Sequence, residues 1–132
     1  MKYFKFLVLF VVAGIFQGCP LEGDSEIVAN LTIINNSDEM IVILIKHSNN
    51  EVIPSDFRWF EIKDDPIPVD GKFSFTILDD MNQKLWFLFY KQSTLNNHTW
   101  EEIQENNIYD ARYSFTLEEL RAMNWELVYD GE

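Results

Sequence analysis

Two short segments of the chain carry apolar side chains on both faces of an extended strand. Residues 40–46 read MIVILIK and residues 84–90 read KLWFLFY. A strand with one face in water alternates apolar and polar residues, whereas a strand without this alternation needs cover on both faces. No other feature constrains the fold as much. We predict that residues 40–46 form a central, covered strand and that residues 84–90 form another strand that is apolar on both faces.

Five further segments have strand patterns, and clusters of turn residues separate them. Residues 72–77 (KFSFTI) alternate cleanly, with the apolar side chains on one face. Residues 125–129 also alternate, and we expect Trp125, Leu127 and Tyr129 to point inward. Short strands at this spacing predict a mainly β fold, namely an antiparallel β-sandwich of about seven strands. The other strand candidates are residues 27–34, 57–62 and 108–115.

Two prolines and one glycine mark the middle of the chain. Pro66 and Pro68 confine residues 66–69 to a sheet edge or to an irregular segment, because proline donates no hydrogen bond to a strand ladder. The pair Asp70-Gly71 is typical of a two-residue hairpin turn. We therefore expect a hairpin at this point.

Two capping boxes predict short helices in the last third of the chain. Thr99 stands three residues before Glu102, and Thr116 stands three residues before Glu119. In a capping box each side chain accepts a hydrogen bond from the backbone N–H of the other residue. The expected segments are a polar loop over residues 91–98, a helix over residues 99–106 and a helix over residues 116–124.

The start of the chain is a short apolar run that ends near the only cysteine. Lys2 and Lys5 precede eleven residues, 6–16, that are apolar or glycine, and Gly18 precedes Cys19. A bilayer-spanning helix needs roughly 20 apolar residues, so this run has the length and flanks of a secretory signal. Three interpretations remain open: a lipid acceptor at Cys19, an ordinary cysteine after cleavage elsewhere, or an uncleaved anchor.

Residues 1–19 resemble a bacterial lipoprotein signal peptide. The resemblance implies that the Cys19 thiol carries a diacylglycerol through a thioether and that the leader is cut between Gly18 and Cys19. The segment Phe16-Gln17-Gly18-Cys19 departs from the usual Leu-small-small-Cys pattern at two places. The expected organisation is a signal peptide over residues 1–18, the lipidated cysteine and a tether over residues 19–26, and one β-sandwich domain over residues 27–132.

The segment RYSFTLEELRAMNWELVYDG (residues 112–131) resembles the end of small lipoproteins of unknown function from Bacteroidales. LTIINNSDEMI (residues 31–41) and TWEEI (residues 99–103) are similar to earlier parts of the same proteins. The middle of the chain departs from them, and the final Tyr129-Asp130-Gly131 lacks their usual proline. The resemblance implies a β-rich fold and a cell-envelope location, with the outer membrane expected, and it carries over no active site.

The chain is strongly acidic, with a formal net charge of −12. Loss of Lys2 and Lys5 with the leader would lower this charge by two more units, to −14. Such a charge repels nucleic acid and anionic headgroups, so a membrane link must come from covalent lipid. A negative surface fits a cationic protein partner, and plain solubility is the alternative explanation.

Few residues point to catalysis or to metal binding. His47 and His98 are the only histidines, and their spacing with the acids matches no zinc or calcium motif. We expect no metal, no cofactor and no enzymatic activity. Trp100 follows a polar segment, which makes it the tryptophan that we expect to be exposed for contact with a ligand or partner.

Three functions compete for such a chain. The first is a lipid-anchored, non-enzymatic binding or accessory module of the cell envelope. The second is an acidic inhibitor or immunity-type protein that covers a cationic site, with acids on one face and salt-sensitive binding. The third is a hydrolase, which would require acidic or histidine side chains that converge in a pocket.

Overall fold

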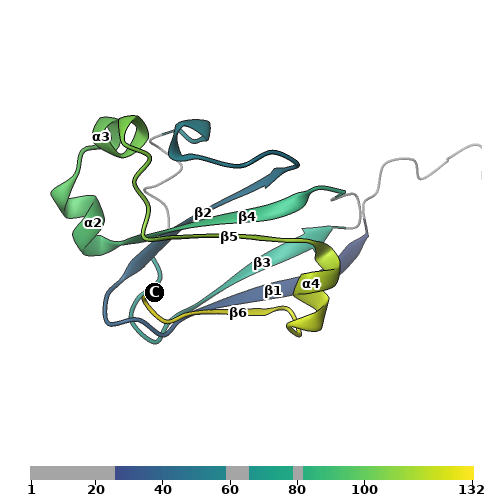
Figure 1. Cartoon of the computed structure of the whole chain (residues 1–132). Coiled ribbons are helices and arrows are strands. Elements are labelled where there is room, and N and C mark those ends of the chain that lie inside the picture. Colours follow the sequence, from purple (N-terminus) through teal and green to yellow (C-terminus); the bar gives the residue numbers. More distant parts are fainter. Residues whose placement is uncertain (1–25, 59–65, 79–81) are drawn as a thin grey trace, which may run out of the picture.

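A computed structural model describes residues 26–58, 66–78 and 82–132, which form a mainly β body (Figure 1). The strands belong to two sheets of three, in the orders β3-β1-β6 and β2-β4-β5. The elements in chain order are β1 (Ile27–Asn35), β2 (Ile41–Ser48), the 3-10 helix η1 (Pro54–Asp56), β3 (Lys72–Leu78), β4 (Lys84–Lys91), α2 (Gln92–Asn97), α3 (Trp100–Glu105), β5 (Ala111–Phe115), α4 (Leu117–Ala122) and β6 (Glu126–Tyr129).

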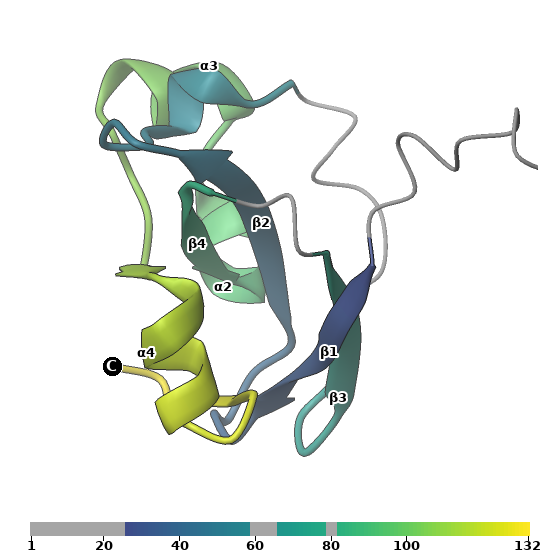
Figure 2. The ribbon, with the colours of Figure 1, turned by 90° about the vertical axis from the view of Figure 1, so that its right-hand side faces the viewer.

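One apolar core lies between the two sheets. Its buried members come from every strand and from α4, and they include Leu31 and Ile33 of β1 and Phe87 and Phe89 of β4. The rings of Phe89 and Tyr129 stack at a centroid distance of 4.7 Å, which joins the sheets directly. Figure 2 shows β1 and β3 on one side and β2 and β4 on the other.

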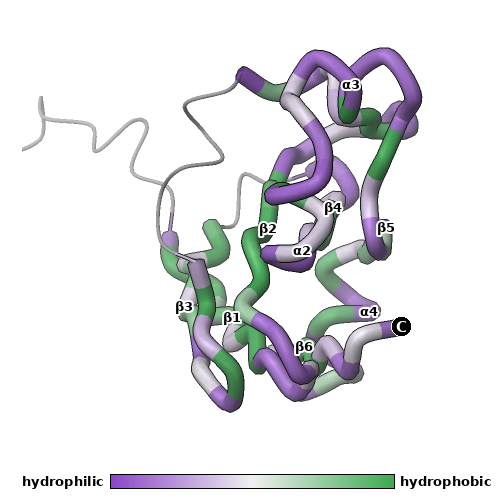
Figure 3. Tube along the Cα trace, turned by 90° about the vertical axis from the view of Figure 1, so that its left-hand side faces the viewer, coloured by the Kyte–Doolittle hydropathy of each residue, from purple (hydrophilic) through white to green (hydrophobic). Residues whose placement is uncertain are grey.

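A second apolar cluster covers the outer face of the β2-β4-β5 sheet. Val42, Leu44 and Leu88 contribute from the sheet, and Ile103 of α3 packs over them with zero exposure. The hydropathy colours of Figure 3 show a mainly hydrophobic β2 beside a mainly hydrophilic segment around α3. The predicted cover on both faces is therefore confirmed, because the core lies on one side and the helices α2, α3 and η1 on the other.

The structure corrects the predicted place of β2. We predicted a central strand, but β2 is at the edge of its sheet, and among the described residues its second neighbour is an isolated bridge between Ile41 and Ile67. Burial on both faces arises here from layers above and below, which does not require a strand on each side. Residues 84–90, predicted as a strand that is apolar on both faces, form β4, which lies between β2 and β5.

The sandwich prediction holds only in its coarser part. The described residues contain six strands, and the seven-strand sandwich is not confirmed. The strand candidate over residues 57–62 falls mostly outside the described residues. The arrangement is also not purely antiparallel, because β6 pairs parallel to β1, with Ile33 opposite Leu127. Leu127 and Tyr129 are buried as predicted, and Trp125 packs against the core.

The expected polar loop over residues 91–98 is wrong, because Gln92–Asn97 form helix α2. The backbone N–H and the hydroxyl of Ser93 donate to the Glu39 carboxylate at 2.9 and 3.0 Å. These two bonds hold the pKa of Glu39 below its ordinary value, with the hydroxyl as the larger cause. The first turn of α2 is thus bound by a carboxylate that is distant in sequence, so no local capping pattern predicts this helix.

The hairpin expected at Asp70-Gly71 is also wrong. In a hairpin the segments on the two sides of the turn pair with each other. Here Ile67, before the turn, pairs with Ile41 of β2, whereas β3, after the turn, pairs with β1. The turn itself is tight, since Asp70 has a φ of 60° and a Cβ on Gly71 would lie 2.7 Å from Pro68 Cγ. This turn therefore carries the chain from one sheet to the other.

Both predicted capping boxes are present. The Thr99 hydroxyl accepts from the Glu102 backbone N–H, and the Thr116 hydroxyl accepts from that of Glu119, each at 3.2 Å. In return the two glutamate carboxylates accept from the threonine backbone N–H groups. The helices α3 and α4 begin where the sequence placed them, and each has six residues.

The fully buried amide of Asn35 links the two sheets. Its Nδ2 lies within hydrogen-bond distance of the carbonyl oxygens of Glu39 (2.8 Å), Ile67 (3.0 Å) and Pro68 (3.1 Å). Its Oδ1 accepts from the backbone N–H of Ser37 at 3.0 Å and from the Ser37 hydroxyl at 2.6 Å. One side chain thus satisfies the polar groups of the β1–β2 turn and of the segment before β3.

Replacement of this amide should destabilise the protein more than an ordinary surface change. We expect Asn35→Ala to lower the free energy of unfolding by about 2–4 kcal/mol, because several buried donors and acceptors lose their partner at once. Urea denaturation followed by tryptophan fluorescence measures this. The adjacent, exposed Asn36→Ala is the control and should stay within about 0.5 kcal/mol of the wild type; equal effects of the two variants would contradict the role of Asn35.

Candidate functional site

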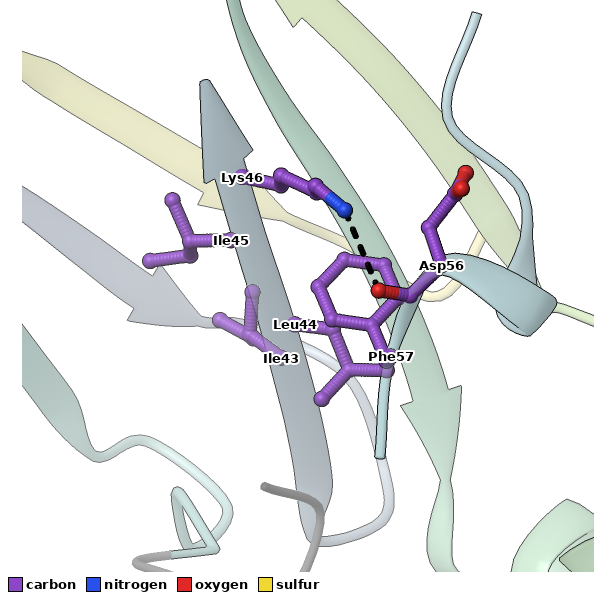
Figure 4. A pocket seen from close by; sticks show the side chains of 6 residues that line it. All are labelled: Ile43, Leu44, Ile45, Lys46, Asp56 and Phe57. Carbon is purple, nitrogen blue, oxygen red and sulfur yellow. Dashed lines mark hydrogen bonds between the residues drawn. The ribbon is translucent and has the colours of Figure 1, made fainter. Parts of the chain in front are cut away.

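A hollow of about 340 Å³ lies beside the outer edge of β2. Four consecutive β2 residues line it, and Asp56 and Phe57 close it from the side of η1 (Figure 4). Leu44 and Phe57 are buried in the second cluster, whereas Ile43 and Ile45 are half-buried and pack against the core. The accessible lining is about equally polar and apolar, although four of the six lining residues are aliphatic or aromatic.

Lys46 is the cation of this hollow. Its Nζ donates to the backbone carbonyl oxygen of Asp56 at 3.1 Å and lies 5.7 Å from the centre of the Phe57 ring. The Asp56 carboxylate accepts a hydrogen bond of 2.8 Å from the backbone N–H of Ile53. The ammonium and the carboxylate thus serve separate structural contacts, and they do not form an acid–base pair facing the hollow.

The backbone of β2 supplies hydrogen-bonding groups at the same edge. Ile41 exchanges two backbone hydrogen bonds with Ile67, at 3.0 and 2.8 Å. Because backbone groups of alternate residues point to the same side of a strand, Ile43 and Ile45 direct theirs to this edge as well. The site combines apolar side chains with strand-edge amides and carbonyls, which is the chemistry of a binding surface.

A second hollow, of about 350 Å³, lies where β4 begins and α4 starts. Carboxamides, one ammonium and one hydroxyl dominate its lining, and the hydroxyl of Thr116 is already engaged in the capping box of α4. The side chains are mostly exposed, so water competes for each of their hydrogen bonds. The lining residues are Asn49, Asn82, Gln83, Lys84, Thr116, Leu117 and Glu118.

The two histidines lie apart in the fold. His47 is in β2 beside Phe75, with ring centroids 6.4 Å apart, whereas His98 follows α2 and its Nδ1 lies 3.4 Å from the Glu102 carboxylate. In the part of the chain that the structure describes, no group of three or more potential ligands is placed to hold a metal ion. The same residues include no helix long and apolar enough to cross a membrane.

Of the predicted contact and lipidation residues, only Trp100 lies among the described residues. Trp100 is half-buried at the start of α3 and packs against the second apolar cluster, so it is less accessible than we expected. Gly18 and Cys19 lie outside the described residues. The structure therefore does not bring Trp100 into either hollow.

Sequence reasoning missed the part played by Arg112 of β5. Its guanidinium lies 5.0 Å from the Tyr109 ring and 5.7 Å from the Trp86 ring, and it forms an ion pair with Glu51. It also donates to the Val52 carbonyl oxygen at 3.3 Å. These contacts fasten the segment after β2 to the sheet, and the alternation of residues 108–115 gave no signal for them.

The hollow beside β2 was missed as well. Two features of the sequence contribute to it: β2, which is apolar on both faces, and Pro54, at which η1 begins. Residues 59–65, the continuation of this segment, lie outside the described residues. Neither feature alone predicts a concave surface.

No protein-family model, no curated protein and no solved structure matches the chain.

Two buried tyrosines, Tyr90 and Tyr129, have side-chain pKa values well above the ordinary value for tyrosine. In the described residues the hydroxyls of Tyr90 and Tyr129 have no hydrogen-bond partner, and both side chains are at most 1% exposed. Burial, followed by the charge of Asp110, raises the pKa of Tyr129 to about 12 and raises the pKa of Tyr90 further. Asp110 itself accepts from the Lys91 backbone N–H and the Thr94 hydroxyl.

These tyrosines predict alkaline unfolding. A raised pKa means that the folded state keeps Tyr129 neutral while the unfolded chain loses the proton near pH 10, so stability falls as the pH rises from about 10 through 12. Tyr129→Phe should remove roughly 2–3 kcal/mol of that loss. It should be nearly neutral at pH 7, because the deleted hydroxyl has no partner. Chemical denaturation from pH 7 to pH 12 tests this, and identical pH profiles would refute it.

Proposed function

We propose that the chain is a lipid-anchored, non-enzymatic binding or accessory module of a bacterial cell envelope, attached through Cys19 to the outer membrane. The observation that carries the proposal is the position of the only cysteine, three residues after an eleven-residue apolar run and directly after Gly18. A lipoprotein cysteine carries two or three acyl chains. At about 0.8 kcal/mol for each buried methylene, such an attachment is effectively permanent.

The surface of the described body supports a binding role. The hollow beside β2 offers apolar side chains and strand-edge backbone groups, and its one ammonium is already bonded to a carbonyl oxygen. Such an arrangement suits the contact of another molecule by burial and backbone hydrogen bonds. We infer that the body is of the sandwich type, in keeping with the Bacteroidales lipoproteins of unknown function that the sequence resembles.

A second candidate is an acidic inhibitor or immunity-type protein that covers a cationic partner. The observation in its favour is α3, a six-residue helix that exposes Glu101, Glu102 and Glu105. Negative charge in a first helical turn is also favoured by the helix dipole, so solubility and capping explain the same residues. The two candidates differ in salt dependence, because contact by charge weakens steeply as ionic strength rises.

The anchor is tested by removal of its sulfur. We expect Cys19→Ser to abolish incorporation of labelled palmitate and to move the protein from the membrane fraction to the soluble fraction, because a hydroxyl forms no thioether. The measurement is metabolic labelling with palmitate, followed by immunoprecipitation and fractionation of cells.

A matched variant tests whether lipidation needs the thiol at position 19 or only a thiol near this position. In the double variant Cys19→Ser, Ser25→Cys the thiol count is restored, but the sulfur lies six residues further along the chain. This variant should also remain unlabelled, because lipidation requires the cysteine directly after the cleavage point. The proposal would be refuted if the Cys19→Ser protein took up palmitate or if that protein stayed in the membrane fraction.

A further inference from the structure

The folded body has two distinct ends along its strands. Figure 1 shows that β1 begins at the end that also holds the start of α4, and that α2 and α3 lie at the opposite end. The pairing of Ile27 with Leu78 places the end of β3 beside the start of β1. The nine residues of β1 span roughly 30 Å at 3.3 Å for each residue, which sets the scale of the separation between the ends.

The N-terminal segment, residues 1–25, leads into Glu26 and so joins the body at the start of β1. If Cys19 is the lipidated residue, as proposed above, seven peptide steps connect it to Glu26, the first described residue. A fully extended chain of that length reaches about 25 Å. The start of β1 is therefore held within this distance of the lipid surface, whereas α2 and α3 are reached only across the additional length of the body.

Charge favours an upright body over one that lies flat. The exposed acids at the α2–α3 end outnumber the bases there, such as Lys72 and Lys91, and a flat body would bring these acids to anionic headgroups. Fixed charges are screened beyond a Debye length of about 8 Å at physiological salt, so a separation of about 30 Å removes the repulsion. The exposed acids at this end include Asp38, Glu101, Glu102, Glu105 and Asp130.

Among the described residues, the end at the start of β1 has no net positive charge that would attract it to an anionic membrane. Ile27 is 68% exposed and Val28 is 36% exposed, so apolar side chains are available where the tether enters. The described, exposed charges there include the acids Glu26, Glu118, Glu119 and Glu126 and the bases Lys84 and Arg121. This end is therefore acidic too, and the covalent lipid has to hold it at the membrane.

We propose that the lipid-anchored body stands on the bilayer with the start of β1 toward the lipid and with α2 and α3 presented away from it. The surface at the α2–α3 end is then the part of the protein that a partner in the surrounding space meets first. This inference depends on the anchor at Cys19, and it adds the orientation of the body and the surface that it displays.

The test places one fluorophore at each end of the full, lipidated chain. Because acylation consumes the Cys19 sulfur, a single introduced cysteine is the only free thiol available for labelling. Gln83→Cys marks the end near β1, and Asn97→Cys marks the end of α2; both residues are exposed carboxamides, so the substitutions are matched in charge and size. The labelled proteins are reconstituted into vesicles of phosphatidylethanolamine and phosphatidylglycerol that contain lipids with a nitroxide quencher on the headgroup.

We expect quenching to be several-fold stronger for the label at position 83 than for the label at position 97. In vesicles of neutral phosphatidylcholine, or in 1 M salt with its Debye length of about 3 Å, the difference should shrink, because the repulsion that disfavours a flat body is removed. Equal quenching at the two positions in anionic vesicles, or stronger quenching at position 97, would overturn the orientation.

The anchor and the orientation fail in different ways. Mass spectrometry of the amino-terminal peptide and flotation of the vesicles report whether Cys19 carries lipid and holds the protein. An unlipidated protein that does not float refutes the anchor, and the orientation falls with it. A lipidated protein that floats but shows equal quenching leaves the anchor standing and refutes the orientation alone.

Discussion

The rest of the structure depends on one buried carboxamide, the side chain of Asn35. Two sheets that share a core need a place where the chain passes from one to the other, and such a passage brings backbone N–H and C=O groups into an apolar region. Asn35 lies at this passage, where its Nδ2 and Oδ1 bond both the turn before β2 and the segment before β3. Its backbone N–H also donates to Gly71 and its carbonyl accepts from Asp70. Together with the shared apolar core, this residue fixes the placement of the two sheets at the point where the chain passes between them.

The position of the helices follows from the same arrangement. Sheet β3-β1-β6 buries one face and exposes polar side chains such as Asn30, Ser74 and Thr76 on the other, so it needs no further layer. Strands β2 and β4 carry apolar residues on both faces, and the second face has to be covered by α2, α3 and η1. The helices are too short to be stable alone, and their buried residues, such as Ile103, hold them to the sheet.

Much of the fold was predictable from local patterns, because the signals concerned are local. The alternation of residues 72–77 and the boxes at Thr99 and Thr116 each involve residues within a few positions of one another. The errors concern contacts between distant segments. Helix α2 depends on Glu39, which is 54 positions from Ser93, and the turn at Asp70 depends on the pairing of Ile67 with the other sheet. The hollow beside β2 belongs to the same class, because its walls come from segments that only the tertiary fold places together.

A short tether and an asymmetric body together determine what the protein presents. The sequence argument places the membrane attachment before β1, and the topology places α2 and α3 at the far end of the strands. In the proposed orientation, salt screens the acids of α3 from the bilayer but not from an approaching molecule. The hollow beside β2 is lined by residues 43–46 of that strand and so lies between the two ends of the body. In the proposed binding role, its apolar side chains and strand-edge backbone groups would determine which contacts persist, because charge governs encounter more than lifetime.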